Sequence, residues 1–255
     1  MPYATNGDVA LYYESHGASG PGLVFAHGAG GNATSWWQQV PAFAGSHRVV
    51  VFDHRGFARS PCPREQQSAS RFEGDLLAVM DAAGLETATI VCQSMGGWTG
   101  VRAAVNCTAR ISGVFLANTP GAVRTSATTA NMAALSERVA RTGLVNAAIS
   151  AEFAARDPAG ALLYQQISAY NTQARPDFRD EAVFVTPEQV RACGVPFAML
   201  ASDLDPLFPP QVLASVAADI GAPCVRINGA GHSTYFEKPR EFNAMLVDFL
   251  RRSAG

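Results

Sequence analysis

The stretch Cys92-Gln93-Ser94-Met95-Gly96 decides how this chain of 255 residues is interpreted. It follows the apolar, β-prone run 88–91 and opens a second apolar segment, 97–105, that has the character of a helix. A serine on such a sharp strand-to-helix turn is held in a strained backbone conformation, so the residues two before and two after it must be small. Gly96 satisfies this requirement, and Cys92 satisfies it less well. We therefore interpret the stretch as a nucleophile elbow that presents Ser94.

Partners for a serine nucleophile occur later in the chain. A free serine hydroxyl is weak, so a base must take its proton and an acid must orient that base. His232 lies in the glycine-rich stretch 229–233, and two acids, Asp203 and Asp205, lie in the stretch 202–210. These residues by themselves leave open which of the two aspartates serves.

The order serine, aspartate, histidine is the one found in α/β-hydrolases, and this sequence resembles that superfamily over nearly its whole length. The landmarks that carry the resemblance are the elbow together with His27-Gly28-Ala29-Gly30-Gly31, the run 53–60, the segment Asp205-Pro206 and the run 231–239. The resemblance implies an α/β fold with a doubly wound, mostly parallel sheet. It also implies a serine-nucleophile enzyme of the carboxylesterase or lactonase type.

The resemblance assigns the catalytic triad to Ser94, Asp205 and His232. Asp205 is preferred over Asp203 because it begins the family's D-x-x-x-P pattern. His232 is preferred because it alone, among the five histidines, lies in the loop where this fold carries its base. Asn118 occupies the place where some relatives carry the acid, and an amide cannot serve as one.

An oxyanion hole is implied at two backbone N–H groups, those of Ala29 and Met95. The helix that starts just after Ser94 points its positive dipole end at the same place. Gly28 and the glycines that follow Ala29 are interpreted as letting the backbone approach a substrate. A glycine-rich turn also suits phosphate binding, but the run 27–31 lacks both the GxGxxG fingerprint and the terminal GK[ST] of a P-loop.

Aromatic residues near these landmarks are candidates for the substrate pocket. We expect Trp36, Phe57 and Trp98 to line it together with Gly28, and Trp37 is a further candidate. Large aromatic side chains occur as often in a core as in a pocket, so core packing is the alternative for each of them.

The chain is expected to divide into a core and an inserted cap. Strand-like and helix-like stretches alternate through 1–120 and again through 195–255, which predicts the α/β-hydrolase core. The predicted strands are 9–14, 23–26, 47–52, 89–92, 111–117, 196–201 and 224–228, and the clearest predicted helices are 34–43, 71–83, 97–106 and 239–252. Between these parts, 121–194 is rich in alanine, serine and threonine and has helical patches without strands, which predicts a helical cap.

Composition and charge bound the class of partner. The net charge is −2 and no basic block occurs, which argues against nucleic acid and anionic membranes as partners. The first residues lack the features of a signal peptide, and no run of about 18 apolar residues is present to span a bilayer. Five cysteines without metal-ligand spacing favour reduced thiols. We expect a cytoplasmic monomer or homodimer that acts on a small-molecule substrate without a metal or a cofactor.

The leading functional hypothesis is a serine hydrolase that cleaves a carboxylic ester or lactone of small to medium size through an acyl-enzyme. The superfamily also contains carbon–carbon bond hydrolases, lyases, and cofactor-free haloperoxidases and perhydrolases, which stay open as alternatives. Ser94 argues against dehalogenases and epoxide hydrolases, which carry aspartate at the elbow, and the single lysine, Lys238, argues against lysine-dependent lyases. A hydrolase-derived ligand receptor is a further alternative, distinguished by slow turnover. The seven arginines and seven acidic residues of 121–194 balance, which does not favour a highly anionic substrate.

Overall fold

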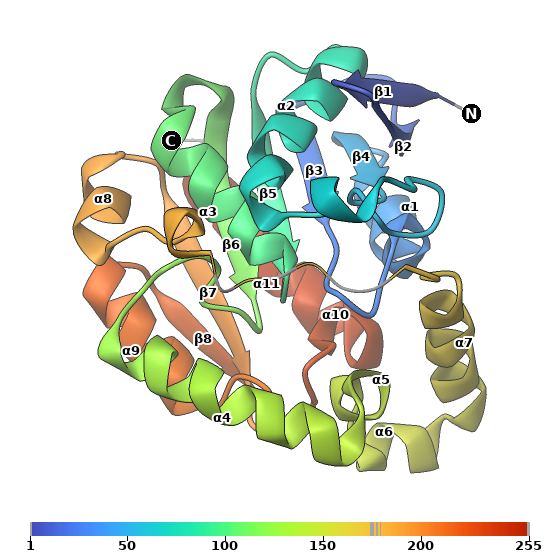
Figure 1. Ribbon diagram of the computed structural model, residues 1–255, viewed down its shortest axis with the longest axis vertical. Coiled ribbons are helices and arrows are strands. Elements are labelled where there is room, and N and C mark those ends of the chain that lie inside the picture. Colours follow the sequence, from blue (N-terminus) through green and yellow to red (C-terminus); the bar gives the residue numbers. More distant parts are fainter. Residues whose placement is uncertain (1, 174–175, 177, 179, 254–255) are drawn as a thin grey trace.

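An eight-stranded sheet forms the centre of the molecule (Figure 1). The structure is a computed structural model, and it describes residues 2–173, 176, 178 and 180–253, apart from the side chains of residues 136, 142 and 145. The strands lie side by side in the order β1-β2-β4-β3-β5-β6-β7-β8. Their bounds are β1 (Tyr3–Asn6), β2 (Val9–His16), β3 (Gly22–Ala26), β4 (Arg48–Phe52), β5 (Ala88–Gln93), β6 (Ile111–Ala117), β7 (Phe197–Ser202) and β8 (Cys224–Ile227).

Parallel pairing dominates this sheet. β3 lies between β4 and β5, with Val24 opposite both Val50 and Ile90, and the parallel pairs continue through β6 and β7 to β8. In this sheet only β2 runs the other way, because both of its neighbours, β1 and β4, pair antiparallel with it. Parallel strands that are buried on both faces consist of almost continuous apolar residues, and such runs are easily recognised in the sequence. The predicted doubly wound, mostly parallel sheet is confirmed.

Helices cover both faces of the sheet and bury two separate apolar clusters. Successive residues of a strand point to opposite faces, so Leu23 and Phe25 lie in one cluster and Val24 in the other. Helices α2 and α3 contribute to the cluster of Val24, and α11 contributes to that of Phe25. The flanking helices are α1 (Gln39–Phe43), α2 (Phe72–Ala82), α3 (Gly96–Asn106), α9 (Pro210–Ile220), α10 (Thr234–Glu237) and α11 (Pro239–Ser253). The short 3-10 turns are η1 (Ala33–Trp36), η2 (Arg64–Gln66), η3 (Ala69–Arg71), η4 (Thr108–Arg110) and η5 (Glu181–Val183).

The segment between β6 and β7 is helical wherever the structure assigns it regular elements. It contains α4 (Ser126–Thr142), α5 (Leu144–Ala148), α6 (Ala151–Arg156), α7 (Pro158–Ala169) and α8 (Pro187–Ala192). In Figure 1, α4 to α6 run along the bottom of the molecule and α7 rises beside them. Helix α8 packs against α3 and α9, so it lies among the helices that flank the sheet. None of the helices in the described part of the chain is long and apolar enough to cross a membrane.

The division into a core (1–120 and 195–255) and a cap (121–194) stays a prediction. Residues 1, 174–175, 177, 179 and 254–255 of these ranges lie outside the described residues.

Several elements differ from the expectations drawn from the sequence. Strand β1 and the helices α8, α9 and α10 were not predicted. The single helix predicted over 34–43 is divided into the turn η1 and the helix α1. Pro41 accounts for this division, because proline lacks a backbone N–H and its ring would clash with the carbonyl four residues earlier in a continuous helix. Pro41 instead lies in the first turn of α1, where proline is tolerated.

A buried ion pair ties the loop after β4 to α2. The Arg55 guanidinium donates to both carboxylate oxygens of Asp75, with 2.6 Å between Arg55 Nε and Asp75 Oδ2. Both side chains are almost completely buried. Asn6 Nδ2 also donates to Asp75 Oδ1 at 2.8 Å, which connects β1 to the same point. The run 53–60 therefore acts here as a scaffold, as its resemblance to a family landmark implied.

Replacing Asp75 by alanine should lower the free energy of unfolding by about 3–5 kcal/mol, because Arg55 would stay buried without its partner. The matched control is Asp81→Ala, which removes a carboxylate that lies 65% exposed and 2.6 Å from Arg110. An exposed pair of this kind contributes about 0–1 kcal/mol. Urea unfolding of both variants measures the difference, and equal losses would contradict the importance of the buried pair.

Candidate active site

Ser94 occupies the turn between β5 and α3 with a left-handed backbone, at φ 50°. A non-glycine residue in this region costs about 1–3 kcal/mol, so its surroundings must hold it there. The Ser94 N–H donates to the Ala117 carbonyl at the end of β6, over 3.2 Å, and the Ser94 carbonyl accepts from Gly97 N–H at 2.9 Å. The predicted strained elbow is therefore present, and it is anchored to the neighbouring strand.

The residues two before and two after Ser94 are packed as the elbow requires. A Cβ at Gly96 would lie 2.1 Å from the Ala26 carbonyl oxygen, so the start of α3 rests directly on the end of β3. Cys92 fits where glycine is common because Gly100 faces it, and a Cβ at Gly100 would lie 2.3 Å from Cys92 Sγ. Burial raises the pKa of the Cys92 thiol far above its usual range. Cys92 is thus a packing residue, because its thiol stays protonated and does not act as a nucleophile.

His232 and Asp205 form a buried pair beside this turn. His232 Nδ1 lies 2.9 Å from Asp205 Oδ2. The other carboxylate oxygen, Oδ1, accepts from the N–H groups of Leu207 and Phe208 at 2.8 and 3.1 Å. A carboxylate held in this way favours the tautomer with the proton on Nδ1, so the lone pair of the ring lies on Nε2. Within the described part of the chain, His232 Nε2 is buried and has no hydrogen-bond partner.

One hydrogen bond joins the loop of His232 to the serine turn. Gln93, the residue before Ser94, donates from Nε2 to the His232 carbonyl oxygen over 3.1 Å. The three predicted triad residues follow the carboxyl ends of β5, β7 and β8, which meet at one edge of the sheet. The fold therefore gathers Ser94, Asp205 and His232 at that edge, although 138 positions separate the serine from the histidine.

A polar network behind Asp205 was missed in the sequence. Asn118 donates from Nδ2 to Asp205 Oδ2 at 3.1 Å and to Ser202 Oγ at 2.9 Å, and Thr234 Oγ1 donates to Asn118 Oδ1 at 2.8 Å. All of these side chains are buried. The sequence identified Asn118 only as an amide in the place where some relatives carry the acid. A signal existed, since Asn118 directly follows β6 and Ser202 ends β7, and these neighbouring parallel strands end at the same edge of the sheet.

Asp203, the alternative acid, faces away from the histidine. Its Oδ1 accepts from Gly229 N–H at 2.7 Å, which shapes the turn after β8. Asp203 is half-buried, whereas the Asp205 side chain is fully enclosed. The geometry thus favours Asp205 as the partner of His232.

A cavity of about 500 Å³ opens over Ser94. Its lining is mostly apolar and comes from the elbow, the loop of Ala29, α4, α5 and the loop after β7. The lining residues are Ala29, Ser94, Met95, Trp98, Met132, Leu135, Val139, Ala140, Leu144, Pro176, Phe178, Leu207 and Phe208. In the described structure, neither the Ala29 nor the Met95 backbone N–H donates to another protein group, so both are available to a substrate. The two predicted oxyanion donors and the predicted nucleophile therefore belong to one cavity.

Three of the predicted pocket residues are corrected by this cavity. Trp36 does not line it and packs in the core, with ring centroids 4.9 Å from Phe25 and 4.6 Å from Tyr235. Phe57 is likewise buried, 5.2 Å from the His27 ring. Gly28 packs directly against the serine turn, because a Cβ at Gly28 would lie 2.9 Å from Ser94 Cβ.

Sequence position alone did not reveal which face of the sheet each of these residues joins. Trp37, the further candidate, is 49% exposed and does not line the cavity either. Trp98 does line the cavity, and its part in substrate binding stays a prediction.

His27 fixes the loop that carries Ala29. Its Nδ1 bonds the Gly28 carbonyl oxygen at 2.8 Å, and its Nε2 accepts from His54 N–H at 3.0 Å. Complete burial lowers the pKa of His27 to about 4, so the ring is neutral near pH 7. The role of His27 in this arrangement is to hold the loop in place.

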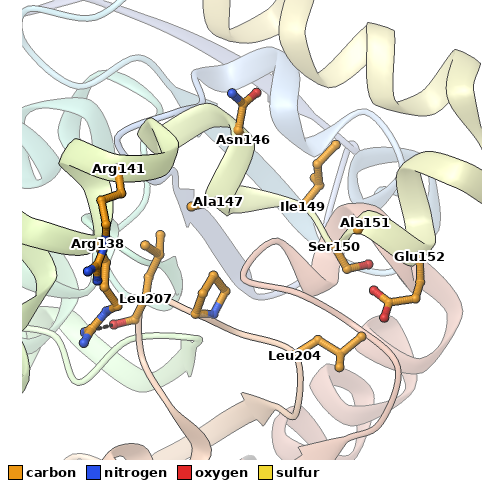
Figure 2. Close-up of a pocket in the computed structure, with 11 residues that line it drawn as sticks. Arg138, Arg141, Asn146, Ala147, Ile149, Ser150, Ala151, Glu152, Leu204 and Leu207 are labelled. Carbon is orange, nitrogen blue, oxygen red and sulfur yellow. Dashed lines mark hydrogen bonds between the residues drawn. The ribbon is translucent and has the colours of Figure 1, made fainter.

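A second cavity, of about 400 Å³, lies on the other side of Leu207 (Figure 2). Arg138 and Arg141 reach it from α4, while Ser150 and Glu152 reach it from the start of α6 (Figure 2). Leu207 lines both cavities and so stands between them. Among the described residues, no group of three or more His, Cys, Asp or Glu side chains is arranged to hold a metal ion.

This fold, with a left-handed serine turn and a buried aspartate–histidine pair at the carboxyl edge of the sheet, defines the α/β-hydrolase class. The profile of the Alpha/beta hydrolase family matches residues 23–245. The chain therefore belongs to that family, and the resemblance in its sequence is confirmed.

Individual relatives have several different activities in their names. The chain is 39% identical over 118 residues to a putative carbamate hydrolase RutD of Azorhizobium caulinodans, covering 46% of this chain and 44% of that protein. It is 34% identical over 113 residues to 3-oxoadipate enol-lactonase 2 of Acinetobacter baylyi, covering 44% and 42%. The chain thus spans less than half the length of these curated relatives. The crystal structure of the enol-lactonase from Burkholderia xenovorans LB400 is similar over 98% of this chain and 100% of its own, at 25% identity and a TM-score of 0.77.

Asp205→Asn should change the tautomer of His232. The backbone donors at 207 and 208 would keep the amide oxygen in the place of Oδ1, so the new NH₂ group would face His232 Nδ1. The ring would then accept on Nδ1 and carry its proton on Nε2, where it no longer acts as a base. Nitrogen-15 NMR of the imidazole measures the tautomer directly. Asp203→Asn is the matched control and should leave it unchanged; the opposite result would move the acid to Asp203.

Proposed function

We propose that the protein is a serine hydrolase that cleaves a carboxylic ester or lactone of a small to medium molecule through an acyl-enzyme. The observation that carries this proposal is the pairing of His232 Nδ1 with Asp205, which leaves Nε2 without a partner at the edge of the sheet that carries Ser94. A base with its lone pair free at this place is what a serine nucleophile requires.

In the proposed reaction, Ser94 Oγ attacks the carbonyl carbon while His232 Nε2 takes the hydroxyl proton. The carbonyl oxygen becomes an oxyanion that accepts from the N–H groups of Ala29 and Met95. When the intermediate collapses, His232 gives its proton to the leaving alkoxide and the acyl group stays on Ser94. Water then attacks the acyl-enzyme by the same steps and releases the acid. Asp205 stays ionised throughout, and it orients the ring and stabilises its charged form.

The lining of the cavity supports a substrate with an apolar acyl part. Methionine, leucine, valine and aromatic side chains surround Ser94, and burial of such groups on a ligand contributes about 25 cal/mol per Å² of apolar area. Lactones are candidate substrates in this proposal, because two of the similar proteins are named as enol-lactonases. Carbon–carbon cleavage, lyase and perhydrolase reactions on the same triad are the alternatives, and a carbon–carbon cleavage substrate tests the first of them.

We also propose that the helices between β6 and β7 act as a cap over the cavity. Met132, Leu135 and Val139 of α4 and Leu144 of α5 all line it, which supports control of substrate shape by these helices. The proposed location is the cytoplasm, and the proposed assembly is a monomer or homodimer. The free cysteines at all five positions are in keeping with a reducing compartment.

Ser94→Ala should reduce ester hydrolysis by on the order of 10⁴–10⁶-fold, with a remainder due to the oxyanion hole and binding. Asp205→Asn should reduce it by on the order of 10³–10⁴-fold, because the histidine tautomer is then wrong. The measurement is kcat/KM on p-nitrophenyl esters of rising acyl length, run beside lactones and a carbon–carbon cleavage substrate. Ser46→Ala, which removes an exposed hydroxyl in the turn after α1, is the matched control and should retain full activity.

An organophosphonate supplies a check that does not depend on the choice of ester. It should label Ser94 alone, and labelling should slow at low pH as His232 gains a proton and stops acting as a base. A receptor would also be labelled, so rapid turnover of at least one ester or lactone is required as well. If Ser94→Ala hydrolyses the esters as fast as the parent, serine catalysis is excluded and only the family assignment remains.

A further inference from the structure

Glu237 is a buried carboxylate that the proposed reaction does not use. It ends helix α10, five residues after His232, and is 5% exposed. Both of its oxygens are occupied. Oε1 accepts from Ser150 N–H at 2.9 Å, while Oε2 accepts from Ser150 Oγ at 2.6 Å and from Gly231 N–H at 3.0 Å. A buried carboxylate without hydrogen-bond donors would be strongly destabilising, and here three donors replace the water that Glu237 has lost.

These three hydrogen bonds join two parts of the site that are far apart in the sequence. Ser150 caps the N-terminus of α6, where its Oγ also accepts from Phe153 N–H at 3.1 Å. Gly231 immediately precedes His232. The packing is tight, since a Cβ at Gly231 would lie 2.6 Å from Glu237 Oε1 and 2.8 Å from the Ser150 nitrogen. The carboxylate therefore lies at a junction between the helices that follow β6 and the backbone of the histidine loop.

We propose that Glu237 is a positioning residue that couples the place of His232 to the docking of α6. The ionised carboxylate fixes the peptide before His232 and, through Ser150, the first turn of α6. When α6 is displaced, the two bonds from Ser150 are lost, and the carboxylate that holds Gly231 loses its fixed position. The inference rests on the proposed function, because it assigns a role only if His232 is the base for Ser94.

The charge around Glu237 bears on how the junction responds to pH. Burial raises the pKa of Glu237, while the bonds from Ser150 and Gly231 and the charge of Arg156 on α6 act in the opposite direction. The other titratable or charged side chains nearby on the adjoining elements are Glu152 on α6, His232 on the loop, Tyr235 on α10, Lys238 between α10 and α11, and Arg240 and Glu241 in the first turn of α11.

Protonation of Glu237 would open the junction. A neutral carboxyl is a weaker acceptor than a carboxylate, so the bonds from Ser150 and Gly231 weaken when Glu237 gains a proton. The second cavity adjoins this point, because Ser150 lines it (Figure 2). The junction should therefore loosen as the pH falls through the raised pKa of Glu237, in addition to the protonation of His232 itself.

The test is the rate at which an organophosphonate labels Ser94, measured from pH 4 to 8 on the full chain. Glu237→Gln should slow labelling about 10- to 100-fold at neutral pH, because its NH₂ group faces one of the three donors and the loop shifts. Ser150→Ala, which keeps the backbone bond and removes one hydroxyl, should slow it about three- to tenfold. The double variant should be no slower than Glu237→Gln, since both substitutions act on one junction. Glu241→Gln removes the same charge from a side chain 54% exposed on α11 and should stay within about twofold of the parent.

The pH profile separates positioning from a general loss of packing. In the parent, protonation of either group slows labelling, so the logarithm of the rate should rise by more than about one per pH unit over the range where Glu237 loses its proton, and Glu237→Gln should reduce that slope to about one. Thermal melts ensure that each variant is compared while folded, and Ser150→Ala serves if Glu237→Gln does not fold. Labelling of Glu237→Gln at the parent's rate, or slower labelling with an unchanged slope, would overturn the inference. Absence of labelling in the parent would instead overturn the proposed function.

Discussion

The carboxylate of Asp205 accepts four hydrogen bonds, and the arrangement of the whole site depends on them. Two come from the backbone at Leu207 and Phe208, one from Asn118 and one from His232. A charge buried in this way is tolerated only when donors replace the water that it has lost. The same donors leave the carboxylate one orientation, and that orientation decides which nitrogen of His232 carries the proton. A local electrostatic requirement thus determines the state of a base that lies 27 positions further along the chain.

The backbone stores strain at the same edge of the sheet. Among the residues that the structure describes, three non-glycine residues have a left-handed backbone, namely Ala58, Ser94 and Asn118, with φ of 39°, 50° and 53°. Each follows the carboxyl end of a strand, namely β4, β5 or β6. Such residues cost about 1–3 kcal/mol each, and the parallel sheet with its two apolar clusters supplies the stability that offsets this cost. At this edge, the strained backbone presents Ser94 to the cavity and the Asn118 side chain to Asp205.

The helices between β6 and β7 connect to this edge at several points, and those points have different chemistry. Helix α4 lines the cavity with apolar side chains, and its Asn131 donates to the Leu207 carbonyl oxygen at 3.0 Å. Ser150 at the start of α6 meets the histidine loop through the buried carboxylate of Glu237. Apolar contacts tolerate small shifts, whereas three hydrogen bonds to one carboxylate require a defined geometry. The structure thus combines an adaptable wall for a substrate with a strict connection to the proposed base.

The sequence by itself determined the sheet, the elbow and the three residues of the proposed triad. Continuous apolar runs mark buried parallel strands, and small residues around Ser94 mark a tight turn, because both are local requirements of the backbone. Tertiary structure alone decided which side chains meet. Trp36 and Trp98 both lie near landmarks of the sequence, yet Trp36 packs in the core whereas Trp98 lines the cavity. The contacts of Asn118 with Asp205 and of Glu237 with Ser150 each join residues 87 positions apart. Strand order and the docking of helices set such contacts, and no local pattern of residues records them.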